Sequence, residues 1–239
     1  MLKIQNLNFK FNEKVIFDNA ELEIPKGKIS IIMGANGAGK STLLKIITNN
    51  IKADCSIINE FKETFYLPQN PYYPYGVSVF DYVSSVFYKK NWKWFLSKAE
   101  ESKVNEALKM VELFNQKDME IQKLSAGEFQ KANFALGLLS GADLFLLDEP
   151  LSNMDLINQI KTLENLTNLV KSGVTSVLIM HDINIAANFG DYFIGINKDH
   201  KIVSGSKEEF FKPQNLNDIY NIDFRIMNDD DKIFVQIVD

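Results

Sequence analysis

The residues of this chain best suited to chemistry stand together at positions 34–42, which read G-A-N-G-A-G-K-S-T. Their spacing fits the phosphate-binding pattern G-x-x-x-x-G-K-[ST]. Glycines let the backbone wrap closely round a phosphate chain, so that N–H groups and a helix N-terminus converge on the anion. The pattern places Lys40 on the β and γ phosphates and the Ser41 hydroxyl on Mg²⁺. We therefore predict a nucleotide site; the alternative is a glycine-rich turn that ends in Gly-Lys-Ser by chance.

Four more polar residues follow apolar runs typical of buried strands: Gln69 after residues 64–67, Asp148 and Glu149 after residues 143–147, and His181 after residues 175–180. In open α/β sheets, ligands bind at the carboxyl ends of the strands. There Asp148 can contact Mg²⁺ through its shell, and Glu149 can orient and deprotonate water. The alternatives are that the two acids cap the next helix, and that His181 and Gln69 have structural roles.

The elements that must position these residues indicate a mixed α/β chain with a parallel central sheet. Strands are expected at residues 2–9, 15–24, 28–33, 64–67, 143–147, 175–180, 192–196 and 201–203. Helices are expected at residues 43–47, 99–114, 129–139, 156–171 and 183–189. Residues 49–62 are a short polar segment, and the tail is expected to hold a helix and a hairpin-like end at 223–238.

Two aromatic features fit either packing or binding. Phe11 lies in a polar hairpin, where it either joins a small satellite core or provides a platform for an adenine ring. Residues 72–95 are rich in aromatic side chains. Helical spacing puts part of this stretch on one buried face, formed by Val79, Tyr82, Val83 and Val86. The surplus either packs in the core or forms a contact site for another chain.

A second notable helix start lies at residues 124–128, which read L-S-A-G-E. Ser125 and Glu128 have the spacing of a capping box, which is a sufficient structural reason for the pair. It does not explain Gly127 or the exposure of a helix N-terminus, an arrangement that suits a second phosphate contact. Asp182, directly after His181, can cap the following helix.

Composition narrows the class of protein. The chain has 239 residues, with 26 basic against 31 acidic residues and a net charge of −5, so net charge does not suggest a nucleic-acid partner. Its single cysteine, Cys55, cannot form an internal disulfide, which fits a reducing compartment. No apolar run approaches the roughly 18 residues that span a bilayer, and the N-terminus alternates like a strand rather than a signal peptide. We expect a cytoplasmic chain whose membrane role comes through a partner.

In their order along the chain, these features resemble the ATP-binding cassette (ABC) family over nearly the whole sequence. The resemblance implies a P-loop NTPase fold in one domain over residues 1–239, with an N-terminal antiparallel β portion, a helical subdomain inserted at about 72–139 and a tail from about 206. It also implies that ATP contacts Phe11 through its adenine and the loop residues Gly34, Asn36, Gly37, Ala38, Gly39, Lys40, Ser41 and Thr42.

The resemblance assigns roles to the remaining site residues as well. It implies Mg²⁺ ligation by Ser41, Gln69 and Asp148, and catalysis by Lys40, Glu149 as the catalytic glutamate and His181 as the switch histidine. Residues 124–128 match the family's L-S-G-G-Q sequence, with Ala126 and Glu128 as departures. Ser125, Gly127 and Asp155 would then face the ATP of a second copy, because one copy binds ATP from one side only. The expected partner is thus an identical chain, in a homodimer that forms on ATP binding.

Two segments look like the ATPases of importers for siderophore-bound iron, haem or cobalamin. They are H-D-I-N-I-A-A-N-F-G-D at 181–191 and F-K-P-Q-N-L-N-D-I-Y-N-I-D-F at 211–224. This resemblance implies a peripheral protein at the cytoplasmic face of the membrane. It would dock on an integral membrane permease near Gln69 and residues 72–95, in a system with an extracellular substrate-binding protein. Residues 43–68 look shorter than in typical members, which predicts a reduced antiparallel β part.

Rival functions remain open at this point. Related zinc and manganese importers share some of the tail pattern. A soluble cassette ATPase in iron–sulfur cluster assembly or DNA repair is a further alternative. The acidic balance and the lack of a coiled-coil insertion argue against DNA repair, and the importer-like tail argues against cluster assembly. Intact Glu149 and His181 argue against a binding module without turnover.

Overall fold

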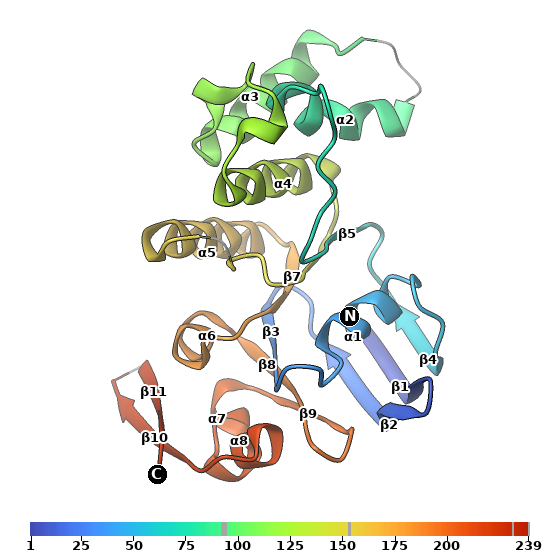
Figure 1. Cartoon of the computed structure of the whole chain (residues 1–239), viewed down its shortest axis with the longest axis vertical. Coiled ribbons are helices and arrows are strands. Elements are labelled where there is room, and N and C mark those ends of the chain that lie inside the picture. Colours follow the sequence, from blue (N-terminus) through green and yellow to red (C-terminus); the bar gives the residue numbers. More distant parts are fainter. Residues whose placement is uncertain (92–94, 153, 231, 239) are drawn as a thin grey trace.

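The computed structural model describes residues 1–91, 95–152, 154–230 and 232–238. At its centre is a six-stranded sheet in the order β5-β6-β7-β3-β8-β9 (Figure 1). Its strands are β3 (Ile29–Met33), β5 (Thr64–Leu67), β6 (Leu144–Leu147), β7 (Thr175–Ile179), β8 (Tyr192–Ile196) and β9 (Ile202–Gly205). All neighbours run parallel except β8 and β9. The carboxyl ends of β5, β6, β7 and β3 therefore meet at one edge, which confirms the predicted parallel α/β fold.

The three middle strands β3, β6 and β7 are buried at every position, because helices cover both faces of the sheet. Ile31 and Met33 pack in one core cluster with α5 (Leu156–Lys171) and α6 (Ile183–Phe189). Ile32 points to the other face and packs with α1 (Lys40–Ile47). This burial on both faces explains why the strands are continuous apolar runs rather than alternating ones.

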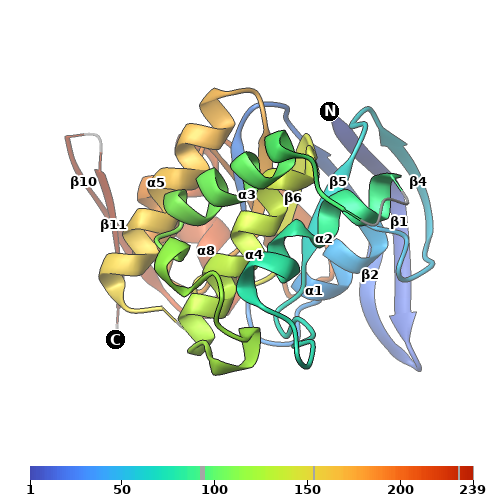
Figure 2. The same ribbon diagram turned by 90° about the horizontal axis from the view of Figure 1, so that it is seen from above.

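A second sheet lies beside α1 and has the order β2-β1-β4. It contains β1 (Leu2–Phe11), β2 (Lys14–Ile24) and β4 (Asp54–Asn59), all antiparallel. Figure 2 shows this sheet at one side of the molecule, opposite the C-terminal hairpin. Strand β4 was missed in the sequence because it is an edge strand that is exposed at every residue but Cys55, and so lacks an apolar run.

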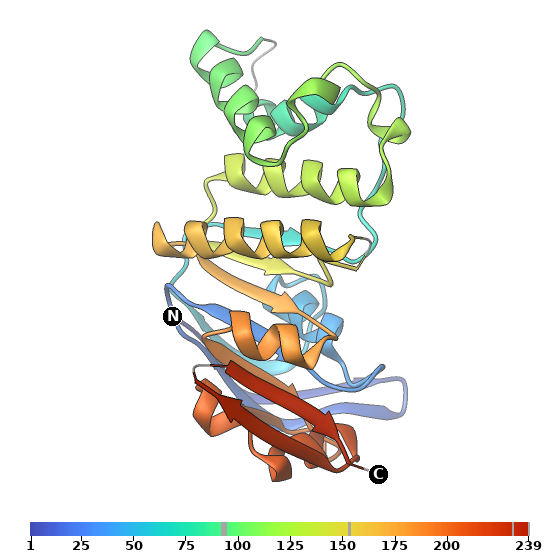
Figure 3. The ribbon, with the colours of Figure 1, turned by 90° about the vertical axis from the view of Figure 1, so that its left-hand side faces the viewer.

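Three helices form an outer layer beyond α5, seen from the side in Figure 3. They are α2 (Val79–Asn91), α3 (Lys98–Met110) and α4 (Ala126–Ser140), with short 3-10 turns at Phe114–Gln116 and Ile121–Lys123. Helix α3 ends four residues before the predicted 114, since Glu112 adopts a left-handed φ of 60°. Helix α4 begins at Ala126, within the predicted loop. The subdomain boundaries at about 72, 139 and 206 stay predictions.

The tail contains α7 (Lys207–Phe210), α8 (Pro213–Tyr220) and a hairpin of β10 (Phe224–Asp229) and β11 (Lys232–Ile237). Two asparagines of α6 bind the edge of β11. The Val235 N–H donates to Asn184 Oδ1 at 2.7 Å, and Asn188 Nδ2 donates to the Ile233 carbonyl at 3.1 Å. No helix among the described residues has the length and apolar character that crossing a membrane requires.

Candidate active site

The loop between β3 and α1 depends on its glycines. Gly37 and Gly39 have positive φ angles of 76° and 106°. At Gly39 a Cβ would also lie only 2.5 Å from Ile16 Cγ2, so glycine is required there by both backbone angle and space. Helix α1 begins directly after Gly39 and has no side-chain cap. Its first N–H groups are therefore not bound by a capping side chain, which suits an anion site.

Lys40 is buried at the base of this loop. Its Nζ donates to the carbonyls of Gly34 at 2.9 Å and Ala35 at 3.0 Å. Burial lowers the pKa of Lys40, while the negative charges of Glu149 and Asp148 oppose this shift. A buried ammonium group with little competing solvent binds an anion strongly, because its charge is poorly screened.

Ser41 and Asp148 form a set of oxygen donors that fits Mg²⁺. The Ser41 hydroxyl donates to Asp148 Oδ1 at 3.0 Å. Burial raises the pKa of Asp148, and the Ser41 hydrogen bond acts against that rise. No cluster of three His, Cys, Asp or Glu residues that could hold a metal is found among the described residues. Such a sparse donor set fits Mg²⁺, which commonly binds one or two carboxylates together with nucleotide phosphates.

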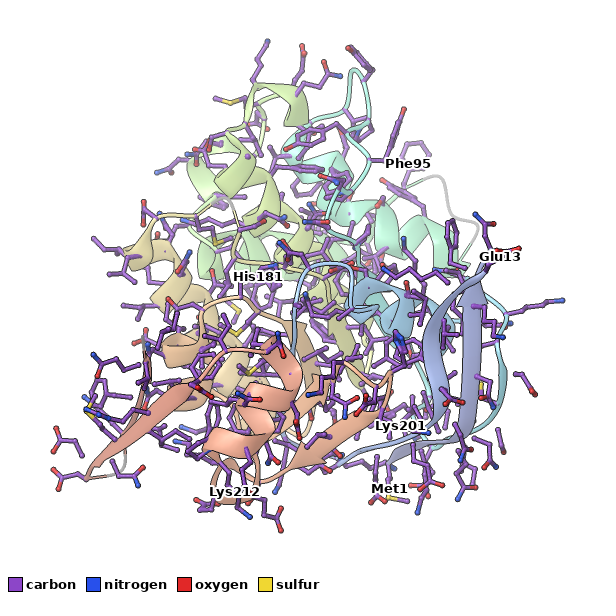
Figure 4. The ribbon with its side chains drawn as sticks, turned by 60° about the horizontal axis from the view of Figure 1, so that its bottom comes forward. Met1, Glu13, Phe95, His181, Lys201 and Lys212 are labelled. Atoms are coloured by element: carbon purple, nitrogen blue, oxygen red, sulfur yellow. The ribbon has the colours of Figure 1, made fainter. Side chains whose placement is uncertain are left out.

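Glu149 lies at the junction of three strand ends. Its Oε2 accepts a hydrogen bond from Gln69 Nε2 at 2.8 Å, and its Oε1 lies 2.7 Å from His181 Nε2. Gln69 follows β5, Glu149 follows β6 and His181 follows β7. Figure 4 labels His181 near the centre of the view. Glu149 has a left-handed φ of 51°, a strained angle for a non-glycine residue that is often found at functional sites.

Lys40, Ser41 and the Glu149 cluster line one cleft of about 720 Å³, within the size range of small-molecule sites. Its walls are Phe11, Lys14, Ile16, Asn36, Gly37, Gly39, Lys40, Ser41, Thr42, Gln69, Glu149 and His181. The predicted Mg²⁺ ligand Asp148 is not among these walls, because it is buried behind Ser41. Phe11 is 67% exposed, so it does not belong to a satellite core. Figure 4 labels Glu13 at the tip of the β1–β2 hairpin that contributes this wall. The walls of the cleft thus include the exposed ring of Phe11 as well as the phosphate loop.

A family model described as ABC transporter matches residues 17–152, more than half of the chain. This chain belongs to the ABC transporter family. It is an ATP-hydrolysing, nucleotide-binding subunit, as the resemblance in the sequence indicated.

Relatives of known name place it more finely. The achromobactin transport ATP-binding protein CbrD of Dickeya dadantii is 30% identical, over 94% of this chain and 89% of that protein. The iron(3+)-hydroxamate import ATP-binding protein FhuC of Bacillus subtilis is 30% identical, over 95% and 90%. Among solved structures, an inward-facing metal-chelate type ABC transporter matches with a TM-score of 0.86 and 25% identity, over 99% of this chain and 96% of that one.

Three predicted site residues of this ABC subunit lie outside the cleft. Ser125 caps α4, where its hydroxyl donates to Glu128 Oε2 at 2.8 Å, and Gly127 lies in the first turn of that helix. Asp155 caps α5 and accepts the Asn158 N–H at 2.8 Å. The cleft of a single chain therefore lacks these groups.

Gly34 and Ala38 also do not line the cleft. Ala38 packs against the core cluster that contains α1, and Gly34 is buried behind the loop, where its carbonyl binds Lys40. Conversely, Lys14 and Ile16 line the cleft but were missed in the sequence. The hairpin register pairs Phe11 with Lys14, so the choice of Phe11 could have pointed to its neighbour across the turn.

The aromatic surplus of residues 72–95 divides into two groups. Tyr73 stacks on Phe129 with ring centroids 3.6 Å apart, and Tyr82 donates to Asn133 Oδ1 at 2.6 Å. A second group is more than three-quarters exposed and consists of Tyr72, Tyr75 and Phe95. Figure 4 shows Phe95 at the margin of the molecule, well away from His181. Trp92 and Trp94 lie outside the described residues.

Proposed function

We propose that this chain powers the import of a metal chelate, of the iron-siderophore, haem or cobalamin class, through a separate membrane permease. The proposal is supported by the names of its relatives, which concern achromobactin and iron hydroxamate, and by its likeness to a metal-chelate type transporter. The chain would lie at the cytoplasmic face of the membrane, bound to the permease. An extracellular substrate-binding protein would deliver the chelate to that permease.

The site works as a half-site in this proposal. The cleft surrounds ATP from one side, and Ser125, Gly127 and Asp155 of a second copy close over it. Two copies then enclose two ATP molecules in a closed, symmetric dimer. Since ATP contacts both copies, binding favours the closed dimer and hydrolysis removes that preference.

Hydrolysis breaks the bond between the γ-phosphorus and the β–γ bridging oxygen while a water oxygen bonds to that phosphorus. Glu149 orients this water and takes its proton. Gln69 and His181 fix the Glu149 carboxylate through their hydrogen bonds of 2.8 and 2.7 Å. Lys40 stabilises charge on the γ-phosphate oxygens. Mg²⁺, bound by Ser41, Asp148 and the Gln69 amide oxygen, would neutralise phosphate charge.

The observation that carries this mechanism is the Glu149 carboxylate, fixed between two side chains at the mouth of the phosphate loop. We expect Glu149→Gln to retain ATP, to lower turnover by about 10²–10⁴-fold, the range for loss of a general base, and to accumulate dimers with ATP. ATPase assays and light scattering measure these effects. Glu164→Gln, on the exposed face of α5, is the control. Normal hydrolysis by Glu149→Gln would refute the assigned role.

The permease contact is proposed at Gln69 and at the exposed aromatics Tyr72, Tyr75 and Phe95. A photo-crosslinking residue at position 75 should capture the permease when the tagged chain is purified in detergent, whereas one at position 227 on the outer hairpin should not. If the complex forms without crosslinks from the aromatic positions, the docking site is wrong. If no polytopic membrane protein co-purifies at all, a soluble assembly ATPase is the better description.

The class of cargo is tested on the purified complex. ATPase activity should be stimulated by ferric chelates but not by zinc or manganese salts.

A further inference from the structure

The segment that joins Glu149 to helix α5 contains two tight turns. The Ser152 N–H donates to the Glu149 carbonyl at 3.2 Å, and the Met154 N–H donates to the Leu151 carbonyl at 3.2 Å. Asp155 ends the segment as the cap of α5. Both ends belong to the proposed ATP site, because Glu149 is the proposed base and Asp155 would face a second copy. The conformation of this segment therefore bears on hydrolysis.

Packing supports the segment on one side only. Leu151 is buried in the core cluster below the outer helices. A cavity of about 200 Å³ lies beside it, with Glu149, Gln159 and His181 among its walls. Glu149 has the left-handed φ of 51°, and such an angle persists in a non-glycine residue only where neighbouring groups fix the backbone. Directed interactions, and not packing alone, must therefore fix this segment.

Gln159, in the second turn of α5, provides two such interactions. Its Nε2 donates to the Leu151 carbonyl at 3.2 Å and to the Met154 carbonyl at 3.1 Å. The amide nitrogen has two hydrogens, one for each carbonyl. The amide oxygen cannot take its place, since an oxygen without a hydrogen does not donate. This position therefore requires two donors and is not satisfied by polar side chains in general.

Helix α5 holds Gln159 in place. The Gln159 backbone N–H donates to the Asp155 carbonyl at 2.9 Å, so the residue lies within the regular helix. Leu163 and Leu166 of the same helix are fully buried. Figure 3 shows α5 between the central sheet and the outer helices. The amide is thus presented to the segment from a helix that is covered on both sides.

We propose that Gln159 is a positioning residue for ATP hydrolysis, which fixes the segment after Glu149 and through it the place of the Glu149 carboxylate. This inference rests on the proposed role of Glu149 as the base. Gln159 is not a wall of the nucleotide cleft, so it should act on turnover rather than on the affinity of one chain for ATP. Without its two donors, the carbonyls of Leu151 and Met154 lose that partner and the strained backbone at Glu149 relaxes.

The test uses two variants of the full chain. Gln159→Met keeps the length of the side chain and removes both donors, whereas Gln159→Glu places carboxylate oxygens against the two carbonyls. We expect kcat to fall about three- to tenfold in Gln159→Met and about ten- to hundredfold in Gln159→Glu, because the first loses hydrogen bonds and the second also opposes like partial charges. The affinity of the single chain for ATP should stay unchanged. Phosphate release and nucleotide titration measure the two quantities.

Asn215 of α8 offers a matched control, because its amide makes the same kind of contact in the tail. Its Nδ2 donates to the carbonyls of Glu209 at 3.0 Å and Phe210 at 3.1 Å. Asn215→Leu and Asn215→Asp therefore remove or oppose an equivalent pair of hydrogen bonds away from the ATP site. We expect both control variants to lower the melting temperature and to leave kcat unchanged.

A merely structural glutamine would behave as Asn215 does. The inference is overturned if Gln159→Glu hydrolyses ATP as fast as Asn215→Asp. If Gln159→Glu does not fold, the comparison of Gln159→Met with Asn215→Leu decides in the same way. Lost turnover in Glu149→Gln with normal turnover in the Gln159 variants refutes only the positioning role, whereas normal turnover in Glu149→Gln refutes the underlying role of Glu149.

Discussion

Helices α1 and α4 both begin with residues predicted to contact phosphate, but their starts are built differently. Helix α1 follows Gly39 in a left-handed conformation and has no side-chain cap. Helix α4 follows Ser125 and has a complete capping box, in which Glu128 Oε2 accepts from the Ser125 N–H at 2.8 Å. The first start leaves N–H groups for a ligand, whereas the second satisfies part of its own.

This difference indicates that the α1 end of the proposed ATP site is complete within one chain, whereas the α4 end depends on a second copy. The loop before α1 has side chains from three other strand ends around it, so its geometry is visible in one chain. The start of α4 is exposed and satisfies part of its own N–H groups, and in the proposed dimer it would gain a ligand only from ATP on a second copy. Substitutions in the loop before α1 should abolish ATP binding, whereas substitutions at the start of α4 should affect only closure of the dimer.

The largest effect is expected from Lys40→Ala at the α1 end. Loss of a buried charge that contacts phosphate should lower kcat/KM by about 10²–10³-fold, as for removal of one preorganised electrostatic group. ATP binding by the isolated chain should fall with it. Titration with a fluorescent ATP analogue and a phosphate-release assay measure both, with Lys52→Ala beyond the end of α1 as the control. Near-normal binding by Lys40→Ala would mean that the cleft is not the nucleotide site.

The α1 end was also the part most readily predicted from the sequence. A glycine-rich loop between an apolar strand and a helix has a fixed spacing, and parallel strands bring Gln69, Glu149 and His181 to one edge wherever the strands are recognised. The sequence could not reveal that Glu149 is the shared partner of the other two. That depends on the strand order β5-β6-β7, which no local pattern specifies.

Ser125→Arg should give a smaller and more selective effect than Lys40→Ala. A bulky cation at the start of α4 should prevent closure of the dimer, so turnover falls while one chain still binds ATP with unchanged affinity. Cap loss alone costs about 1 kcal/mol. Ser97→Arg controls for it, because Ser97 caps α3 in the same kind of capping box with Glu100. Equal turnover in the two variants would remove the proposed role of the α4 end.

The weakest sequence predictions concern elements that lack an apolar signal. Strand β4 lies at an exposed edge, and its place is set by pairing with β1 rather than by its own side chains. The tail looked like a family marker, yet the place of α8 on the sheet depends on how closely Ile219 packs on Gly195. Both are consequences of tertiary packing, which the spacing of residues along the chain does not encode.

Asp143 and Asp148 flank the two ends of β6, and their pKa values shift in opposite directions. Asp148 at the carboxyl end has a pKa that burial raises. At the amino end, burial acts to raise the pKa of Asp143. The hydrogen bonds that its carboxylate accepts from the Glu63 and Lys62 amides outweigh this effect, so the pKa is lowered. Asp148 therefore lowers the free energy of unfolding only once it is ionised. Its contribution to stability is fully kept below its usual pKa and falls as pH rises through its folded-state pKa. Stability from Asp143 is present above its usual pKa and lost as pH falls through the folded-state pKa.

The two asparagine variants should therefore shift stability in opposite directions at pH 7. Asp148→Asn should raise the melting temperature without nucleotide by about 2–4 °C, which corresponds to roughly 1 kcal/mol for a chain of this size, and Asp143→Asn should lower it by a similar amount. As pH falls from 7, the Asp148 difference should shrink first, because its raised pKa lets the native carboxyl become protonated early. The Asp143 difference should persist to pH 4 and shrink only below the usual pKa of an aspartate, because the pKa of its native carboxyl is lowered. Scanning calorimetry across this range measures them. A lower melting temperature in Asp148→Asn than in the unchanged chain would show that Asp148 is not destabilising, and that the site does not trade stability for the charge that Mg²⁺ and ATP require.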